Sequence, residues 1–151
     1  MPLATIDTPI GRLGVVETDD AITRLIWNCS DEAEPSPLLE LAKEQVRAYF
    51  AGALDRFDLP LAPDGSEFQR AVWDAMLAIP LGQTRTYGDL AVELGHPAQA
   101  VGQACGANPI PVIIPCHRIV GTQGLGGFSG MGGVEMKVQL LRHEGAYSLL
   151  L

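Results

Sequence analysis

A cysteine followed at once by two basic residues is the feature of this sequence most able to do chemistry. Cys116 follows Pro115 and precedes His117 and Arg118. The thiolate is the reactive form of cysteine, and neighbouring cationic groups lower the pKa of a thiol. The pattern therefore predicts a nucleophilic Cys116 whose pKa is lowered by His117 and Arg118. The alternative is that Cys116 is a small buried apolar residue, which is a common state of free cysteine.

A histidine and a glutamate could complete such a site. Consecutive side chains of an extended segment point to opposite faces, so His117 would reach the Cys116 sulfur only through a turn or a bridging water. Near the end of the chain, His143 precedes Glu144, and a third group commonly orients the imidazole in a Cys/His site. Alternatively, His117 is a structural histidine bound to backbone, and Glu144 is a solvated helix end.

Three further features could hold or line the site. Asn108 begins a proline-rich segment that leads to Cys116, and its amide could hold the cysteine loop. Tyr87 follows Thr86, a candidate helix cap; its hydroxyl could donate a proton, or its ring could simply close the edge of a core. The glycines between 121 and 133 allow tight turns but match neither dinucleotide nor P-loop spacing, so we expect no nucleotide cofactor.

The first half of the chain must fold into a sheet and one helix. Residues 3–27 contain three apolar, β-branched runs separated by turn signals, which predicts an antiparallel meander. Ser36 and Pro37 are typical of a helix start, and apolar residues at helical spacing then continue to Gly52. Because the following residues are rich in proline and polar groups, we expect an N-terminal domain over residues 1–65.

The second half is predicted to be mostly helical, in a C-terminal domain over residues 66–151. Caps and apolar spacing indicate four helices, at about 66–79, 86–94, 98–106 and 134–143. The second and third are separated by Gly95 and His96 and fit a helix-turn-helix. The small residues of the third helix favour close packing, either on another helix of the domain or on nucleic acid. The expected fold class is α+β.

Composition restricts the class of protein further. With 47% hydrophobic and 19% charged residues, the 151-residue chain can bury a core, and its longest apolar runs are too short to span a membrane. The three cysteines form no CxxC pair, and no secretion signal is recognisable. We therefore expect free thiols, a cytoplasmic location and no structural metal. Nothing in the sequence indicates an oligomer, so we expect a monomer.

Charge is unevenly distributed between the two halves. The net charge is −8. Residues 1–65 hold 12 acidic and 5 basic residues, a charge of −7, whereas residues 66–151 hold 6 and 5, a charge of −1. An acidic chain does not hold nucleic acid by bulk charge. The second half could approach a polyanion without strong repulsion, although it has no basic stripe to attract one.

The segment around Cys116 resembles a known family. Residues 108–121, which read NPIPVIIPCHRIVG, resemble the active-site segment of the O6-alkylguanine-DNA alkyltransferases, also called methylated-DNA–protein-cysteine methyltransferases. The flanking sequences FQRAVW at 68–73, GQTRTYGDLA at 82–91 and LLRHEG at 140–145 are similar to helices of the family. The resemblance covers about residues 66–146, and the N-terminal part is similar in layout only.

This resemblance implies a fold and a reaction. The N-terminal domain would be a ribonuclease H-like sheet with one helix. The C-terminal domain would be winged-helix-like, with a helix-turn-helix in the minor groove of double-stranded DNA. An O6-alkylguanine would be flipped out of the stack, and its alkyl group would pass irreversibly to Cys116 in a single turnover, without metal or organic cofactor. O4-alkylthymine is a second candidate substrate.

The resemblance also implies a role for each matching residue. His117 would take the thiol proton through a water, and Glu144 would orient His117. Tyr87 would donate a proton to the leaving base, and Asn108 would hold the active-site turn. The alkyl pocket would be lined by Phe128, Ser129 and Pro111. The DNA-binding residues would be Thr86, Ala98, Gln99, Ala100, Gly102 and Arg118.

One position departs from the family pattern. Gln99 stands where the family places an arginine that fills the space left by the flipped base. A glutamine can fill that space and form hydrogen bonds, but it lacks the charge and the stacking plane of a guanidinium. Because residues 98–106 contain no basic residue at all, we expect weak DNA binding.

Two other functions remain open from sequence alone. One is a lesion-sensing DNA-binding module that recruits other repair proteins without transferring the alkyl group. Relatives of that kind lack the reactive cysteine, so the presence of Cys116 favours transfer. The other is a general Cys/His hydrolase with turnover on small acyl substrates, in which the predicted helix-turn-helix is only a scaffold.

Overall fold

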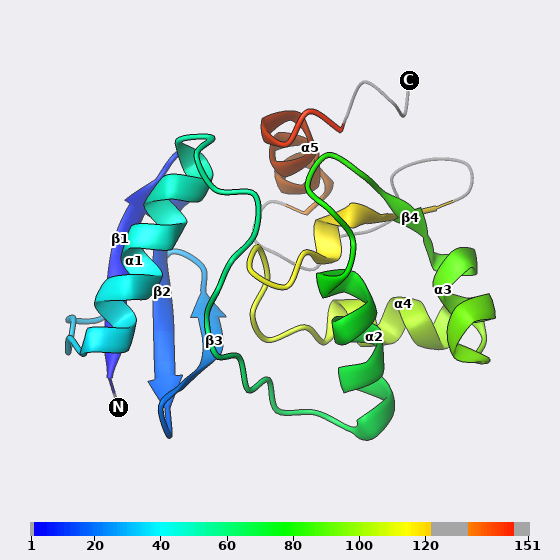
Figure 1. The fold of residues 1–151 in the computed structure, drawn as a ribbon, viewed down its shortest axis with the longest axis horizontal. Helices are drawn as coiled ribbons and strands as arrows, with labels where there is room; N and C mark the ends of the chain where they lie inside the picture. The colour runs from blue at the N-terminus through cyan, green and yellow to red at the C-terminus, as the bar shows by residue number, and fades with distance from the viewer. Residues whose placement is uncertain (1, 122–132, 147–151) are drawn as a thin grey trace. The chain divides into compact units, whose positions relative to one another are not determined.

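The computed structural model describes residues 2–121 and 133–146, and its chain divides into two compact units, Met1–Asp64 and Gly65–Leu151 (Figure 1). The fold is an α+β mixture, as predicted from the sequence. Among the described residues, no helix is long and apolar enough to cross a membrane. Phe128 and Ser129, the expected pocket residues, lie outside the described residues.

The first unit is a three-stranded antiparallel sheet with one helix. Its elements, in chain order, are β1 (Leu3–Thr8), β2 (Gly11–Thr18), β3 (Ala21–Ile26) and α1 (Pro37–Phe50). The sheet order is β1-β2-β3, so the predicted meander is confirmed. Helix α1 packs on β1 and β2 (Figure 1). The core of the unit therefore lies between the helix and one face of the sheet.

Local sequence explains the turns and caps of this unit. Asp19 and Asp20 both have positive φ, 51° and 63°, a conformation that fits the tight turn between β2 and β3. Ser36 Oγ accepts a hydrogen bond from the backbone N–H of Leu39 at 3.1 Å, which satisfies one free donor of the first turn of α1. Leu39 is completely buried, so the cap and the core fix the same end of the helix.

The second unit is mostly helical. Its elements, in chain order, are α2 (Glu67–Leu77), β4 (Arg85–Thr86), α3 (Tyr87–Leu94), α4 (Ala98–Gly106), η1 (Cys116–Arg118), β5 (Ile119–Val120) and α5 (Val134–His143). Two capping boxes begin α2 and α3, in which Ser66 pairs with Gln69 and Thr86 with Asp89. Gly95 ends α3 in the left-handed conformation (φ 70°).

Two contacts tie the elements of this unit together. Strands β4 and β5 pair in parallel, with Arg85 opposite Ile119 and Thr86 opposite Val120. This pairing, which the hydropathy pattern did not predict, brings the segment after Cys116 beside the start of α3. Trp73 Nε1 donates to the carbonyl oxygen of Ala104 at 2.8 Å and ties α2 to α4.

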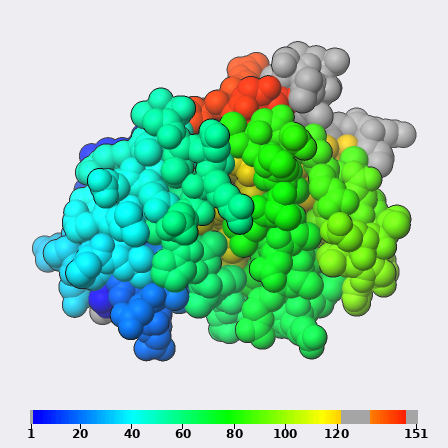
Figure 2. Space-filling view, in the orientation of Figure 1, coloured from blue at the N-terminus to red at the C-terminus, as the bar shows by residue number. Residues whose placement is uncertain are grey.

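The core of the second unit includes the cysteine segment itself. Every residue from 111 to 120 is buried, and only small patches of yellow, the colour of this part of the chain, are visible in the space-filling view (Figure 2). Val101 and Ala104 of α4 are buried as well. Part of α4 therefore packs within its own unit, which was one of the two alternatives left open for its small residues.

Candidate active site

A short turn carries the cysteine. Residues Cys116–Arg118 form the 3₁₀ helix η1, in which the N–H of Arg118 donates to the carbonyl oxygen of Pro115 at 3.0 Å. The N–H of Cys116 donates to the carbonyl oxygen of Ile114 at 2.8 Å. Because the chain turns here, Cys116 and His117 are not constrained to the opposite faces of a strand. The geometric objection to a Cys116–His117 pair is thereby removed.

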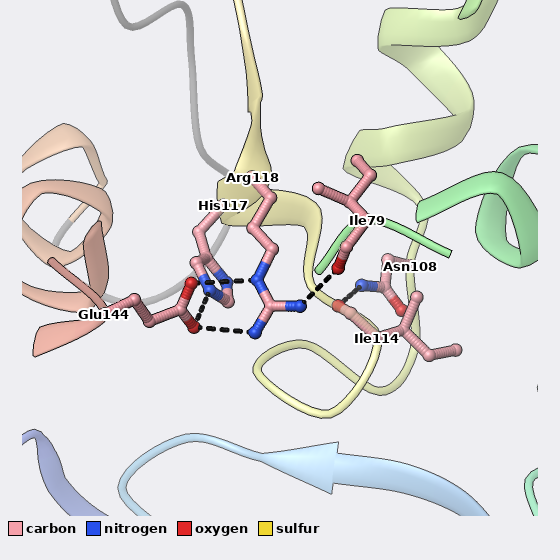
Figure 3. A network of polar contacts seen from close by, with 6 residues as sticks. All are labelled: Ile79, Asn108, Ile114, His117, Arg118 and Glu144. Atoms are coloured by element: carbon pink, nitrogen blue, oxygen red, sulfur yellow. Dashed lines mark hydrogen bonds and ion pairs between the residues drawn. The ribbon is translucent and has the colours of Figure 1, made fainter. Parts of the chain in front are cut away.

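Asn108 binds both ends of the loop before the cysteine. Its Nδ2 donates to the carbonyl oxygen of Ile114 at 2.8 Å, and its Oδ1 accepts from the N–H of Ile110 at 2.9 Å (Figure 3). Within this loop Val112 has a φ of 73°, a left-handed conformation that is costly for a β-branched residue. The amide of Asn108 therefore satisfies two buried backbone groups and helps to hold a strained loop.

Glu144 is the centre of a buried polar network. Its carboxylate lies 2.6 Å from His117 Nε2 and accepts two hydrogen bonds from Arg118, from Nε at 2.8 Å and from Nη2 at 3.0 Å (Figure 3). Arg118 Nη1 donates to the carbonyl oxygen of Ile79 at 2.7 Å. Burial alone would raise the pKa of Glu144, but hydrogen bonds from His117 and Arg118, together with the charge of Arg118, lower it to about 2. Glu144 is therefore ionised at neutral pH.

The network fixes the protonation of His117. An ionised carboxylate only accepts hydrogen bonds, so Nε2 of His117 carries the proton and Nδ1 has a free lone pair. Burial lowers the pKa of His117, although Glu144 opposes this effect. Nδ1 is buried and has no hydrogen-bond partner among the described residues. His117 is therefore a neutral imidazole with an unsatisfied acceptor, which a water molecule would satisfy.

The expected cause of thiol activation is wrong. Burial raises the pKa of Cys116, while a hydrogen bond with Asn108 and the charge of Lys137 act to lower it. Neither His117 nor Arg118 supplies a cation to the sulfur, because His117 is neutral and the guanidinium of Arg118 is bound to Glu144. The neighbours of Cys116 in sequence therefore do not lower its pKa by a positive charge.

Lys137 is a site residue that sequence reasoning missed. It lies in α5 with its side chain fully buried, and its Nζ is 5.8 Å from the centroid of the Tyr87 ring. Burial lowers the pKa of Lys137 to about 8, and Cys116 and Cys105 act in the opposite direction. Helical spacing could have predicted its burial, because Lys137 shares a helix face with Leu140 and Leu141, both completely buried.

Tyr87 is held as a neutral phenol. It is the first residue of α3 and is partly buried. Burial, together with Cys105 and Cys116, raises its pKa to about 12. Its hydroxyl is therefore protonated at neutral pH and can donate a hydrogen bond or a proton.

The expected DNA-binding residues divide into two groups. Ala98 and Gln99 are exposed at the start of α4, and Ala100, Gly102 and Thr86 are partly exposed. Arg118 is different, since its side chain is buried and donates to Glu144 and to the carbonyl oxygen of Ile79. Arg118 therefore lies inside the site with three of its donors bound internally, and its expected contact with DNA stays a prediction.

The remaining expectations concern ligands and thiols. Cys29, Cys105 and Cys116 are all free thiols. Within residues 2–121 and 133–146, no group of three or more histidine, cysteine or acidic side chains could hold a metal ion. Pro111, expected in the alkyl pocket, is buried and forms a backbone bridge with Ile114, so it lies in the loop that Asn108 holds.

Together these contacts place a neutral imidazole, oriented by a carboxylate, next in sequence to a cysteine, which makes the cysteine a candidate nucleophile and the imidazole a candidate base. Two family descriptions match the chain. "6-O-methylguanine DNA methyltransferase, ribonuclease-like domain" matches residues 1–63, and "6-O-methylguanine DNA methyltransferase, DNA binding domain" matches residues 67–146. The chain therefore belongs to the 6-O-methylguanine DNA methyltransferase family, and the resemblance inferred from sequence is confirmed.

Individual relatives match over almost their whole length. The methylated-DNA–protein-cysteine methyltransferase of Mycolicibacterium paratuberculosis is 44% identical over 155 residues, which cover 95% of this chain and 92% of that protein. The constitutive methylated-DNA–protein-cysteine methyltransferase of Bacillus subtilis is 40% identical over 154 residues and 93% of each chain. The crystal structure of Mycobacterium tuberculosis OGT in complex with DNA matches with a TM-score of 0.85 and 41% identity, over 97% of this chain and 94% of that one.

Proposed function

We propose that this protein repairs DNA by direct transfer of the alkyl group of O6-alkylguanine to Cys116. The observation that carries the proposal is the buried contact between Glu144 and His117, 2.6 Å long, which leaves His117 Nδ1 as an unpartnered acceptor next to the cysteine in sequence. A neutral imidazole with a free lone pair is the form that can remove a thiol proton. Family membership supplies the substrate class.

The reaction balances with the residues of this chain. Cys116 Sγ loses its proton, through a water, to Nδ1 of His117. The sulfur then attacks the alkyl carbon, a C–S bond forms, and the C–O6 bond breaks with its electron pair moving to guanine. Tyr87 donates its hydroxyl proton to the base as negative charge develops there. The product is a thioether, which has no easy route back to a thiol, so one protein molecule repairs one lesion.

The other site residues position these groups. Arg118 holds the Glu144 carboxylate that orients His117, and Asn108 holds the loop that leads to Cys116. Phe128 and Ser129 remain our candidates for the alkyl pocket, with Pro111 in the adjoining loop. No cofactor is required, because the thiol, the imidazole and the phenol account for every proton and electron pair.

DNA would be bound by α3 and α4, acting as a helix-turn-helix. Thr86 and the residues of α4 that are exposed or partly exposed, Ala98, Gln99, Ala100 and Gly102, would face the duplex. A β-carbon added at Gly102 would lie 3.9 Å from the Tyr87 ring, an ordinary contact, so interior packing does not require glycine there. We infer that Gly102 is small because DNA approaches closely. We also infer that the protein acts as a cytoplasmic monomer.

Intact-protein mass spectrometry tests the proposal. The protein is incubated with a duplex oligonucleotide that contains one O6-methylguanine. Transfer predicts a mass gain of one methylene unit, located on the peptide that contains Cys116 and absent from Cys116→Ala. Binding without any gain in mass would instead support a lesion-sensing module. Multiple turnovers on a small ester would support the hydrolase. A duplex with O4-methylthymine tests the second substrate.

A further inference from the structure

The turn between α3 and α4 carries the one basic residue of the proposed helix-turn-helix. Residues 86–106 contain two acidic residues, Asp89 and Glu93, and no lysine or arginine, and their single basic residue is His96. The formal charge of this segment is therefore −2 when His96 is neutral and −1 when it is protonated. Because the DNA backbone is a dense row of negative charges, the protonation of His96 changes how this segment meets a duplex.

His96 is exposed and adjoins the residues that we propose to face DNA. Every residue from 95 to 99 is exposed, so the exposed stretch that contains His96 continues without interruption into Ala98 and Gln99 at the start of α4. The backbone N–H of His96 donates to the carbonyl oxygen of Ala91 at 3.1 Å and ties the turn to α3. His96 therefore lies at the edge of the proposed DNA-binding surface, in a turn of fixed backbone.

An aromatic ring of α2 restrains the imidazole of His96. The ring centroids of Phe68 and His96 lie 4.2 Å apart, and the two ring planes are inclined by 41°. Phe68 is partly buried in the first turn of α2, and α2 packs against both α3 and α4 (Figure 1). A side chain that binds a partner usually loses rotamer freedom, which weakens the binding. Because Phe68 already restrains the imidazole, less of this entropy remains to be lost when His96 binds a ligand.

The charged groups near the turn already have partners of their own, whereas His96 has no carboxylate partner. Arg85, just before α3, forms an ion pair with Glu93, with 3.2 Å between Nη1 and Oε2. Asp89 accepts a hydrogen bond from the N–H of Thr86 at 3.0 Å. Within residues 2–121 and 133–146, His96 forms no ion pair. The charged residues of the helices around the turn are Glu67, Arg70 and Asp74 of α2 and Asp89 and Glu93 of α3, and α4 has none. Of the basic residues between 85 and 106, His96 is therefore the one that no carboxylate occupies.

We propose that His96, in its protonated form, binds a phosphate of the DNA backbone and is a DNA-contact residue of this chain; this inference rests on the proposed function. Histidine is the side chain that ordinarily changes its charge near neutral pH. A protonated imidazole donates from its ring N–H groups to phosphate oxygens, and a contact to the backbone is independent of base sequence. DNA should therefore bind more tightly in mild acid. The binding should also depend more steeply on salt there, because each neutralised phosphate releases a counterion.

Fluorescence anisotropy of the full-length protein with an undamaged duplex measures this contact without consuming the protein. Affinities are compared between about 50 and 200 mM salt, at about pH 5.5 and at about pH 8. One additional phosphate contact steepens the slope of log K against log salt by about 0.9, so the loss of affinity between these two salt concentrations grows by about 3.5-fold. We expect this difference between the two pH values in the unmodified protein and not in His96→Gln. His96→Lys, which stays charged, should show the steeper slope at both pH values.

A second exposed histidine provides the matched control. The chain has three histidines; His117 is buried and neutral, and His143 is exposed at the end of α5. His143→Gln should keep the difference between the two pH values. An equal difference in His96→Gln and the unmodified protein, or its loss in His143→Gln alone, would overturn the proposal. Phe68→Leu keeps an apolar side chain without the ring and should reduce the affinity gained in acid. An unchanged gain would overturn the role of the stacked ring.

The two levels of inference can fail separately. Methyl transfer to Cys116 is followed by mass, with a duplex that contains O6-methylguanine, and does not depend on the anisotropy measurement. A protein that gains the methyl group but has the same salt slopes with and without His96 would refute only the phosphate contact. A protein whose salt slopes respond as expected but whose mass does not change would refute the proposed transfer and leave the contact in place. A protein that binds no duplex at either pH would overturn the contact together with the proposed DNA-binding surface of α3 and α4.

Discussion

Glu144 contacts His117 at 2.6 Å across 27 positions of sequence, and both side chains are completely buried. This contact joins the residue that follows α5 to the turn that carries the cysteine. Because Arg118 binds the same carboxylate, the buried negative charge of Glu144 is fully compensated, and the imidazole is left neutral with a fixed tautomer. The orientation and tautomer of His117, which follows Cys116 in sequence, are therefore set by Glu144, the residue that follows α5.

Glu144→Gln should reduce both alkyl transfer and stability. The amide cannot neutralise Arg118, and breaking a buried ion pair by removing one partner costs about 3–5 kcal/mol. It also replaces one acceptor oxygen by an NH2 donor, so His117 and Arg118 compete for the single remaining acceptor and the His117 tautomer is no longer fixed. We therefore expect single-turnover methyl transfer to slow by about 10²-fold or more, the usual contribution of acid–base catalysis. Rapid-quench kinetics and urea unfolding measure the two effects. Glu135→Gln, at an exposed position of α5, should change neither, and an unaffected rate in Glu144→Gln would contradict the scheme.

Acid should destabilise the protein through Glu144. Its pKa is about 2 in the folded protein and 4.5 as the ordinary value, so the folded state binds its proton less readily than the unfolded state. The resulting stability is complete above the ordinary pKa and is lost as pH falls from about 5 toward 2; it amounts to about 3 kcal/mol. Urea unfolding between pH 7 and pH 3 measures the slope. Glu144→Gln should flatten it, and an equally steep slope in that variant would assign the effect to other carboxyl groups.

Tyr87→Phe should separate the activation of the thiol from the departure of the base. The phenol is neutral because its pKa is about 12, so it can donate a proton to guanine. Loss of that donor should slow methyl transfer from DNA by about 10²- to 10⁴-fold. Alkylation of Cys116 by iodoacetamide needs no such donor and should keep its rate within about twofold, since the ring face below Lys137 is retained. Equal losses in both reactions would mean that Tyr87 acts on the sulfur or on folding instead.

Local sequence patterns predicted most helices and the first three strands well, because helix caps and turns depend on residues close together in sequence. Ser36, Ser66 and Thr86 were recognised as helix starts from residue type alone, and each side chain does accept a hydrogen bond from a backbone N–H of the first turn. The meander of β1, β2 and β3 followed in the same way from apolar runs and turn residues. Strands β4 and β5 were missed because a two-residue pairing leaves no periodicity to detect.

The charged partners of the site residues could not be predicted from the residues adjacent to them in sequence. Arg118 lies two residues from Cys116, yet its guanidinium binds Glu144, 26 positions away. Lys137 lies 21 positions from Cys116, and its charge acts to lower the pKa of that thiol, which burial raises. Which charges meet depends on which helix covers the turn, and this is a property of long-range packing. The types of the site residues were thus predictable, whereas the partner of each charge was not.

Gln99→Arg should strengthen DNA binding and accelerate repair. Residues 98–106 contain no basic residue, and Gln99 is exposed near the start of α4, so an arginine there would be free to bind phosphate or to occupy the space of the flipped base. One added phosphate contact should steepen the salt dependence of DNA affinity by about one unit of slope. Fluorescence anisotropy at several salt concentrations measures the slope, and single-turnover methyl transfer measures repair. Gln139→Arg, an exposed glutamine of α5, makes the same change in net charge. Equal affinities and rates for the two variants would show that bulk charge, and not position 99, limits the encounter with DNA.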